Sequence, residues 1–115
     1  MTKLPMLAAA LLAALTLATT SAHAATGAER HTAKGIACEA CHGPDKANPK
    51  EPTLETCTGC HNLKQLVEKT KDKKPHNPHI SPHYQDTLDC INCHVMHGDT
   101  VNFCDQCHSF GFKVP

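Results

Sequence analysis

The sequence contains 115 residues, with eight cysteines and ten histidines but only four aromatic side chains, three of Phe and one of Tyr. A chain of this length allows one small domain, and so few aromatic residues are too little to build a core from protein side chains alone. Lys and Arg number 11, as do Asp and Glu, so there is no basic excess of the kind that nucleic-acid binding requires.

The first 24 residues predict an export signal. A lysine near the start is followed by an apolar run over residues 4–17, and Ala22-His23-Ala24 has the small-x-small form of a cleavage site. We expect cleavage after Ala24 and a mature chain of residues 25–115 that forms one domain. An uncleaved signal anchor is the alternative, but an apolar run of about 14 residues is shorter than the roughly 20 that span a membrane. We therefore expect no stable membrane insertion.

Residues 25–34 are polar and predict a short arm or helical turn, which contains His31. Beyond it the pattern Cys-x-x-Cys-His occurs four times. The copies are Cys38-Glu39-Ala40-Cys41-His42, Cys57-Thr58-Gly59-Cys60-His61, Cys90-Ile91-Asn92-Cys93-His94 and Cys104-Asp105-Gln106-Cys107-His108. Two thiols three residues apart can each add to one vinyl group of a haem, and the following His then faces the iron as its proximal ligand.

The pattern predicts four covalently bound haem c groups. Their attachment residues are Cys38, Cys41, Cys57, Cys60, Cys90, Cys93, Cys104 and Cys107, and their proximal ligands are His42, His61, His94 and His108. Zinc sites, thioredoxin-like sites and disulfide scaffolds also use Cys-x-x-Cys pairs, but zinc needs no His directly after each pair. Such a His after all four pairs has chance odds of roughly one in ten thousand. Because bacterial c-type haem is attached outside the inner membrane, the motifs and the export signal both indicate the periplasm.

Four haems would supply apolar surface of several thousand square ångströms, by rough estimate, that the polypeptide can wrap in place of a core of its own. We expect a mostly irregular fold with a few short α-helices around the haems, and an apoprotein that is largely unfolded. Without Lys3 the mature chain has 10 basic against 11 acidic residues. Since each haem adds two propionates, we expect an acidic surface and no nucleic-acid partner.

Between the second and third motifs, the spacing of Leu63, Leu66 and Val67 predicts a helix, which Pro75 stops. The lysines that follow Glu68 can complement the carboxyl end of this helix, or they can guide an acidic redox partner. The loop 43–52, which precedes the second motif, carries three prolines and no apolar period, so it predicts a surface loop.

Residues 75–83 hold three histidines between three prolines, which exclude a regular helix. A His-rich tract can bind zinc or copper, but each haem iron also requires a second axial ligand. The mature chain keeps five histidines outside the motifs, namely His31, His76, His79, His83 and His97, and four irons need four of them. Met96 is the only methionine after the signal, so at most one iron can have His/Met ligation, and we expect bis-His ligation at all four.

His97 lies three residues after the proximal ligand His94. A distal ligand approaches from the opposite face, and three residues of at most about 3.6 Å each cannot pass around a macrocycle roughly a nanometre across. We therefore expect His97 to reach another haem, the one attached to Cys38 and Cys41, and so to join the early and late motifs.

Taken together, these motifs resemble the small tetrahaem cytochromes c, and more closely the cytochrome domain of periplasmic flavocytochrome c fumarate reductases. The resemblance extends from about His31 to Pro115 and is clearest from His79 onward. It rests on the order of the four motifs, the His before the first, the paired His before Cys90, the segment Cys93-His94-Val95-Met96-His97 and the ending Cys107-His108-Ser109-Phe110-Gly111-Phe112.

The resemblance implies that the distal ligands are His31, His79, His83 and His97, with His76 as the spare. One departure leaves an alternative open. The paired histidines of the family are separated by two residues, as His76 and His79 are, whereas three residues separate His79 from His83. Flavocytochromes also continue into a flavin domain, whereas this sequence ends at Pro115.

These features predict an electron carrier and not an enzyme. We expect it to pass electrons from a quinol-oxidising membrane cytochrome to a separate periplasmic flavoprotein resembling fumarate reductase. A general periplasmic shuttle to other terminal reductases or outer-membrane cytochromes is the alternative. A multihaem reductase of nitrite or a similar oxidant is a third possibility, but it needs an iron with one open side, and all four motifs end in His.

Overall fold

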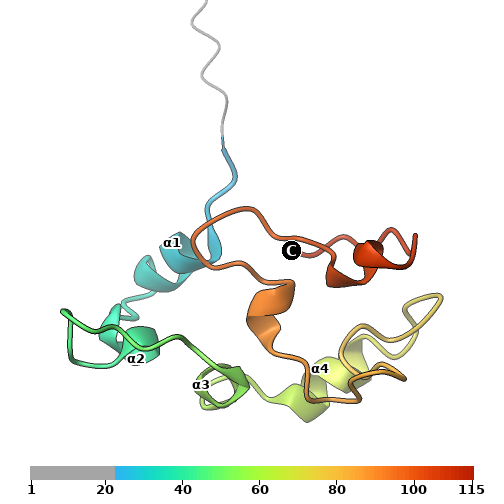
Figure 1. The fold of residues 1–115 in the computed structure, drawn as a ribbon, viewed down its shortest axis with the longest axis horizontal. Coiled ribbons are helices and arrows are strands. Elements are labelled where there is room, and N and C mark those ends of the chain that lie inside the picture. Colours follow the sequence, from blue (N-terminus) through green and yellow to red (C-terminus); the bar gives the residue numbers. More distant parts are fainter. Residues whose placement is uncertain (1–22) are drawn as a thin grey trace, which may run out of the picture.

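Short helices joined by long irregular connections make up the fold (Figure 1). The structure is a computed structural model that describes residues 23–115, so the predicted export signal lies outside the described residues except for its last two positions. The helices are α1 (Gly27–Thr32), α2 (Glu39–His42), α3 (Leu54–Thr58) and α4 (Leu63–Lys69), followed by the 3-10 helices η1 (Cys90–Asn92) and η2 (Phe103–Gln106). Within residues 23–115, β-pairing is limited to an isolated bridge between Ser81 and Gln85. The prediction of a mostly irregular chain with a few short helices is confirmed.

Helix α1 forms where the sequence predicts an arm or helical turn. Thr26 and Glu29 form a capping box, in which the Thr26 hydroxyl accepts from the Glu29 amide at 3.2 Å and the Glu29 carboxylate accepts from the Thr26 amide at 2.7 Å. The hydrogen bond from the Thr26 amide, with a further contribution from the Thr26 side chain, lowers the pKa of the Glu29 carboxyl. The helix docks through its first turn, because Gly27 is buried and the Ala28 amide donates to the Met96 carbonyl at 2.7 Å.

Helix α4 is shorter than the sequence predicts. Asn62 caps its first turn by accepting from the Gln65 amide at 3.0 Å, and the helix ends at Lys69, several residues before Pro75. It ends there because the Thr70 hydroxyl turns back to the Leu66 carbonyl at 2.7 Å.

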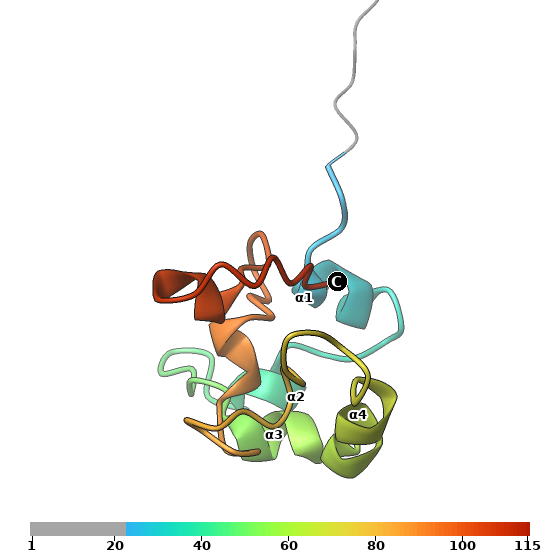
Figure 2. The same ribbon diagram turned by 90° about the vertical axis from the view of Figure 1, so that its right-hand side faces the viewer.

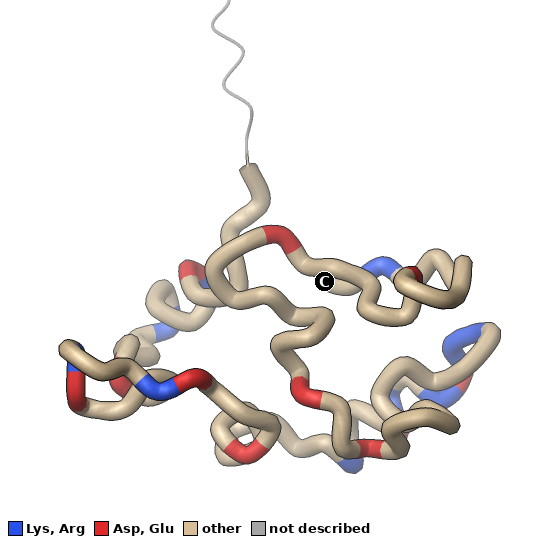
Figure 3. The backbone as a smooth tube through the Cα atoms, in the orientation of Figure 1, with Lys and Arg blue, Asp and Glu red and all other residues tan. Residues whose placement is uncertain are grey.

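The lysines after α4 therefore have different surroundings. Lys69 lies in the last helical turn, Lys71 pairs with Glu68, and Lys73 and Lys74 lie beyond the helix. Basic residues gather along this turn, whereas acidic residues are spread over the chain (Figure 3). Only Lys69 is placed to complement the carboxyl end of α4.

The C-terminal segment returns to α1. Figure 2 shows the C-terminus beside this helix. Arg30 holds it there, with one guanidinium nitrogen donating to the Pro115 carbonyl at 3.5 Å and another to the Ala25 carbonyl at 2.9 Å. At the centre of the molecule, the Asp89 carboxylate accepts from the Leu54 amide at 2.7 Å and so ties α3 to the start of η1.

No hydrophobic side chain among residues 23–115 is fully buried, as the shortage of aromatic residues predicts. Large apolar side chains such as Ile80 and Val101 are 42% and 48% exposed. The apolar residues of α4 are only half-buried. Over the same residues, the helices are all too short or too polar to cross a lipid bilayer.

Candidate haem-binding sites

All four Cys-x-x-Cys-His motifs adopt the same backbone turn. In each, the amide of the His donates to the carbonyl of the first Cys, at 3.0 Å for His42, 2.9 Å for His61 and 2.8 Å for both His94 and His108. The amide of the second Cys donates to the same carbonyl at 3.1 to 3.2 Å. Residues three and four apart in one helical turn share a face, so each turn presents two thiols and one imidazole on the same side.

The eight cysteines are not joined in disulfides. Burial raises the pKa of the Cys57 thiol to about 11, and the neighbouring thiols of Cys90 and Cys41 act in the same direction. Burial likewise raises the pKa of Cys104, with a further contribution from Cys93. The Cys90 thiol of the third motif is therefore close enough to raise the pKa of Cys57 in the second motif.

Each motif histidine faces one histidine from elsewhere in the chain. The pairs are His31 with His61, His42 with His97, His79 with His94, and His83 with His108, with ring centres 6.0, 5.8, 6.4 and 5.9 Å apart. The partners are the four residues that the family resemblance implies as distal ligands.

These separations fit a metal ion between two imidazoles. Two metal–nitrogen bonds of about 2 Å each, with about 1 Å more from each nitrogen to its ring centre, give about 6 Å. Within residues 23–115, no three His, Cys, Asp or Glu side chains come together as a metal cluster. The candidate iron ligands are instead the four histidine pairs. A bis-His haem needs this arrangement, with two cysteines beside one member of each pair.

The imidazole planes differ between the pairs. They are almost parallel for His79 and His94, at 2°, and inclined by 24° both for His42 with His97 and for His83 with His108. The planes of His31 and His61 are almost perpendicular, at 78°. The four sites are therefore not equivalent.

Hydrogen bonds fix the orientation of several rings. Nδ1 of His31 lies 2.7 Å from the Gly27 carbonyl, and Nδ1 of His42 lies 2.8 Å from the Lys50 carbonyl. A carbonyl can only accept, so Nδ1 carries the proton in both rings and Nε2 is left free to bind a metal. Gly43 turns the chain with a φ of 76° at the start of the loop 43–52. The loop then returns, and its Lys50 carbonyl orients His42.

His79 is held by polar side chains at the end of α4. Its Nδ1 lies 2.9 Å from the Thr70 hydroxyl, and its amide donates to Asn77 Oδ1 at 3.0 Å. Burial lowers the pKa of His79 and of the opposite His94, which favours their neutral, metal-binding form. His76 is exposed and packs instead against Phe110, with ring centres 5.7 Å apart.

Met96 packs against the first turn of α1. A Cβ added to Gly27 would lie 2.7 Å from both Sδ and Cε of Met96, so the thioether packs directly on α1. Its neighbour His97 faces His42. This arrangement favours His97 over Met96 as the ligand opposite His42.

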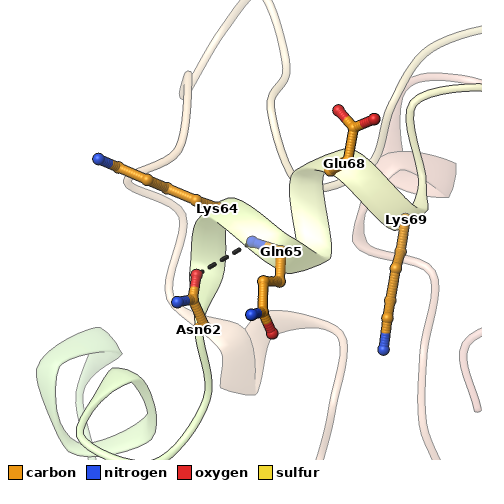
Figure 4. Close-up of a pocket in the computed structure, with 5 residues that line it drawn as sticks. All are labelled: Asn62, Lys64, Gln65, Glu68 and Lys69. Carbon is orange, nitrogen blue, oxygen red and sulfur yellow. Dashed lines mark hydrogen bonds between the residues drawn. The ribbon is translucent and has the colours of Figure 1, made fainter.

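Two surface depressions lie near these elements. The one in Figure 4 covers a face of α4 and is lined by Asn62, Lys64, Gln65, Glu68 and Lys69, with no cysteine or histidine. A second is lined by Cys38 and His42 together with residues of the loop 43–52. Only the second belongs to a candidate haem site.

The repeated attachment turns and the opposed histidines define a c-type cytochrome. The chain matches the family model described as cytochrome c3 over residues 30–109, and it belongs to that family. It is thus an electron-transfer domain of a family that carries covalently bound haem c, and the resemblance found in the sequence is confirmed.

Three relatives are similar to this chain. The acrylate reductase cytochrome subunit of Shewanella woodyi is 35% identical over 81 residues, which cover 68% of each chain. The probable fumarate reductase Ifc3 of Shewanella frigidimarina is 35% identical over 78 residues, covering 66% of this chain and 13% of that protein. The cytochrome c-type protein Cgr1 of Eggerthella lenta is 28% identical over 111 residues, covering 69% and 50%. No solved structure matches the chain.

Thr70 and Asn77, which orient His79, were not predicted from the sequence. Thr70 stands within the lysine run, and Asn77 precedes a proline, so both resemble ordinary turn residues. A turn-forming Asn two residues before a candidate ligand was the one available indication.

Proposed function

We propose that residues 25–115 form a periplasmic tetrahaem cytochrome that carries electrons between a membrane donor and a reductase. Each motif would hold one haem c through its two cysteines and its proximal His. The proposed distal ligands are His97 for the haem at Cys38 and Cys41, His31 for that at Cys57 and Cys60, His79 for that at Cys90 and Cys93, and His83 for that at Cys104 and Cys107.

One observation carries this proposal: every motif histidine faces one other histidine, with ring centres 5.8 to 6.4 Å apart. Haem iron supplies one-electron redox chemistry. The chain would supply two nitrogen donors for each iron, which favour a low reduction potential compared with a His/Met pair. If these histidines filled both axial positions, an iron held there would have no open position for a substrate, so a carrier is favoured over a reductase enzyme.

The proposed donor is a quinol-oxidising membrane cytochrome, and the proposed acceptor is a separate periplasmic flavoprotein. One relative is named as the cytochrome subunit of an acrylate reductase and another as a probable fumarate reductase. Acrylate and fumarate are both carboxylates with a conjugated carbon–carbon double bond, whose reduction takes up two electrons and two protons. We propose an acceptor enzyme for substrates of this class, to which the carrier delivers electrons singly.

A reoxidation assay tests the proposed role. The holoprotein, reduced with dithionite and freed of excess reductant, is mixed anaerobically with a periplasmic extract of the source organism. We expect rapid oxidation of the haems when fumarate or acrylate is also added, and none with heat-treated extract. Oxidation by several unrelated acceptors would favour a general shuttle.

The enzyme alternative is tested on the purified protein alone. Nitrite and cyanide should leave the oxidised and reduced haem spectra unchanged, because no axial position is open. Direct turnover of nitrite, or a spectral change on its addition, would overturn the carrier proposal.

A further inference from the structure

The Thr70 hydroxyl lies at the centre of a small polar network between α4 and the proline-rich segment 75–83. It lies 2.7 Å from the Leu66 carbonyl, 2.6 Å from Asn77 Oδ1 and 2.9 Å from His79 Nδ1. The residues involved are half-buried, so water competes less for these contacts than it would at the surface.

The orientation of the Asn77 amide is fixed by its own contacts. Its Nδ2 donates to the Val67 carbonyl at 2.7 Å, and its Oδ1 accepts from the His79 amide at 3.0 Å. The oxygen atoms that Thr70 faces are therefore acceptors only. The Thr70 hydroxyl has a single proton, and it donates this proton to one of the two oxygens. Thr70 can therefore bond His79 only as an acceptor. His79 must then carry its proton on Nδ1, with the Nε2 lone pair free.

We propose that Thr70 is a positioning residue for His79, which it holds in the Nδ1–H tautomer with Asn77 as its support. This inference rests on the proposed function, because it assigns His79 as an axial ligand. The network fixes the ring plane, which lies within 2° of that of His94. A hydrogen bond donated by Nδ1 also strengthens Nε2 as a donor, which stabilises the ferric iron and lowers its reduction potential.

The same network distinguishes the two candidate histidines of this segment. Among residues 23–115, His76 has no hydrogen-bonding partner for its ring, and its contact is with Phe110. Thr70 and Asn77 thereby select His79 in a tract where spacing alone permits either residue.

The test compares Thr70→Val, which removes the hydroxyl at nearly constant volume, with Thr70→Ser, which keeps it. The matched control is Thr100→Val, because the half-buried Thr100 lies outside the four motifs and its hydroxyl likewise donates to a backbone carbonyl, that of Val114, at 2.9 Å. Asn77→Ala is a second variant that removes the support and leaves Thr70 in place. Each is purified with its haems, and the readouts are redox titration, EPR spectra and displacement of an axial ligand by cyanide.

For Thr70→Val we expect one midpoint potential of the four to rise and one low-spin EPR signal to change. Cyanide, which we expect to leave the unmodified protein unchanged, should displace an axial ligand at one haem of this variant, because removing a partner of a ligating His usually weakens metal binding about 10- to 100-fold. Asn77→Ala should alter the same haem, whereas Thr70→Ser and Thr100→Val should resemble the unmodified protein.

Unchanged potentials and cyanide reactivity in Thr70→Val, in a protein with four low-spin haems, would overturn the role of Thr70 and leave the proposed function standing. Lower thermal stability of Thr70→Val without any change in a haem would mean that Thr70 only ends α4, which also overturns it. If the unmodified protein lacks four low-spin haems, the proposed function itself fails.

Discussion

His76 and His79 are three positions apart in the sequence, but their surroundings differ. His79 is half-buried, faces His94 and is oriented by Thr70, whereas His76 is exposed beside Phe110. Three residues separate His79 from His83, one more than separate the paired histidines of the family that the sequence resembles. Spacing alone could therefore not show which of His76 and His79 is the ligand. The geometry favours His79, although sequence spacing favours neither.

Replacement of each histidine by alanine tests this assignment. We expect His76→Ala to keep all four haems low-spin, because its ring faces no motif histidine. His79→Ala should convert one haem to a high-spin form, since the iron opposite His94 loses a donor. EPR of the oxidised proteins distinguishes the two results, and a high-spin haem in His76→Ala with none in His79→Ala would reverse the assignment.

His97 connects two parts of the chain that are distant in sequence. Its ring faces His42, with centres 5.8 Å apart, although its sequence neighbour among the motifs is His94. His97→Ala should therefore alter the haem attached to Cys38 and Cys41 and leave that of Cys90 and Cys93 low-spin. NMR of the haem methyl groups, assigned through contacts with residues of the first motif, identifies the affected haem.

Met96→Leu is the control for this substitution. It keeps the apolar contact with Gly27 and removes the sulfur, so all four haems should keep their ligands. Loss of a ligand in Met96→Leu, with His97→Ala unaffected, would show that the thioether binds iron.

At the scale of elements, α1 is fixed by close contact with the segment after the third motif. Gly27 is the position where the two backbones meet, and an added Cβ would lie 3.2 Å from Met96 Cα as well as 2.7 Å from its thioether. The same Gly27 carbonyl accepts the Nδ1 proton of His31. Displacement of α1 should therefore disturb both His31 and the segment that carries His97.

Gly27→Ala should lower the stability of the holoprotein, by about 1–3 kcal/mol for an overpacked contact. The better helix propensity of Ala offsets up to about 1 kcal/mol of this cost. Gly98→Ala is the control, because its Cβ would make an ordinary contact of 3.5 Å with Val95. Thermal unfolding followed by haem absorbance measures both, and equal stability of the two variants would contradict the close packing.

The elements that could be predicted are those whose conformation is determined by residues nearby in the sequence. The helical turns of the motifs, the irregular proline-rich tract and the turn before Cys38 follow from residue types within a few positions. The end of α4 could not be predicted, because the helix ends well before Pro75, at Thr70, whose hydroxyl contacts the Leu66 carbonyl and also Asn77, seven residues later. The pairing of His31 with His61 and of His83 with His108 depends likewise on contacts across the fold that spacing does not encode.

At the scale of the whole molecule, the described residues lack a buried hydrophobic core. A chain with so little buried apolar surface cannot offset its conformational entropy, so its stability must come from the groups that it encloses. We expect chain produced without haem attachment to be largely unfolded. Far-UV circular dichroism and amide hydrogen exchange measure this, and a cooperative thermal transition in the haem-free chain would contradict it.

Intact mass combined with EPR of the oxidised holoprotein tests the four bis-His sites most directly. We expect a chain from Ala25 carrying four covalent haems, all low-spin. Because the His31 and His61 planes are almost perpendicular and the other three pairs are within 24° of parallel, one signal should be highly anisotropic and three should have ordinary rhombic form. Fewer than four haems, bound zinc, or a high-spin or Met-ligated iron would contradict the proposed sites.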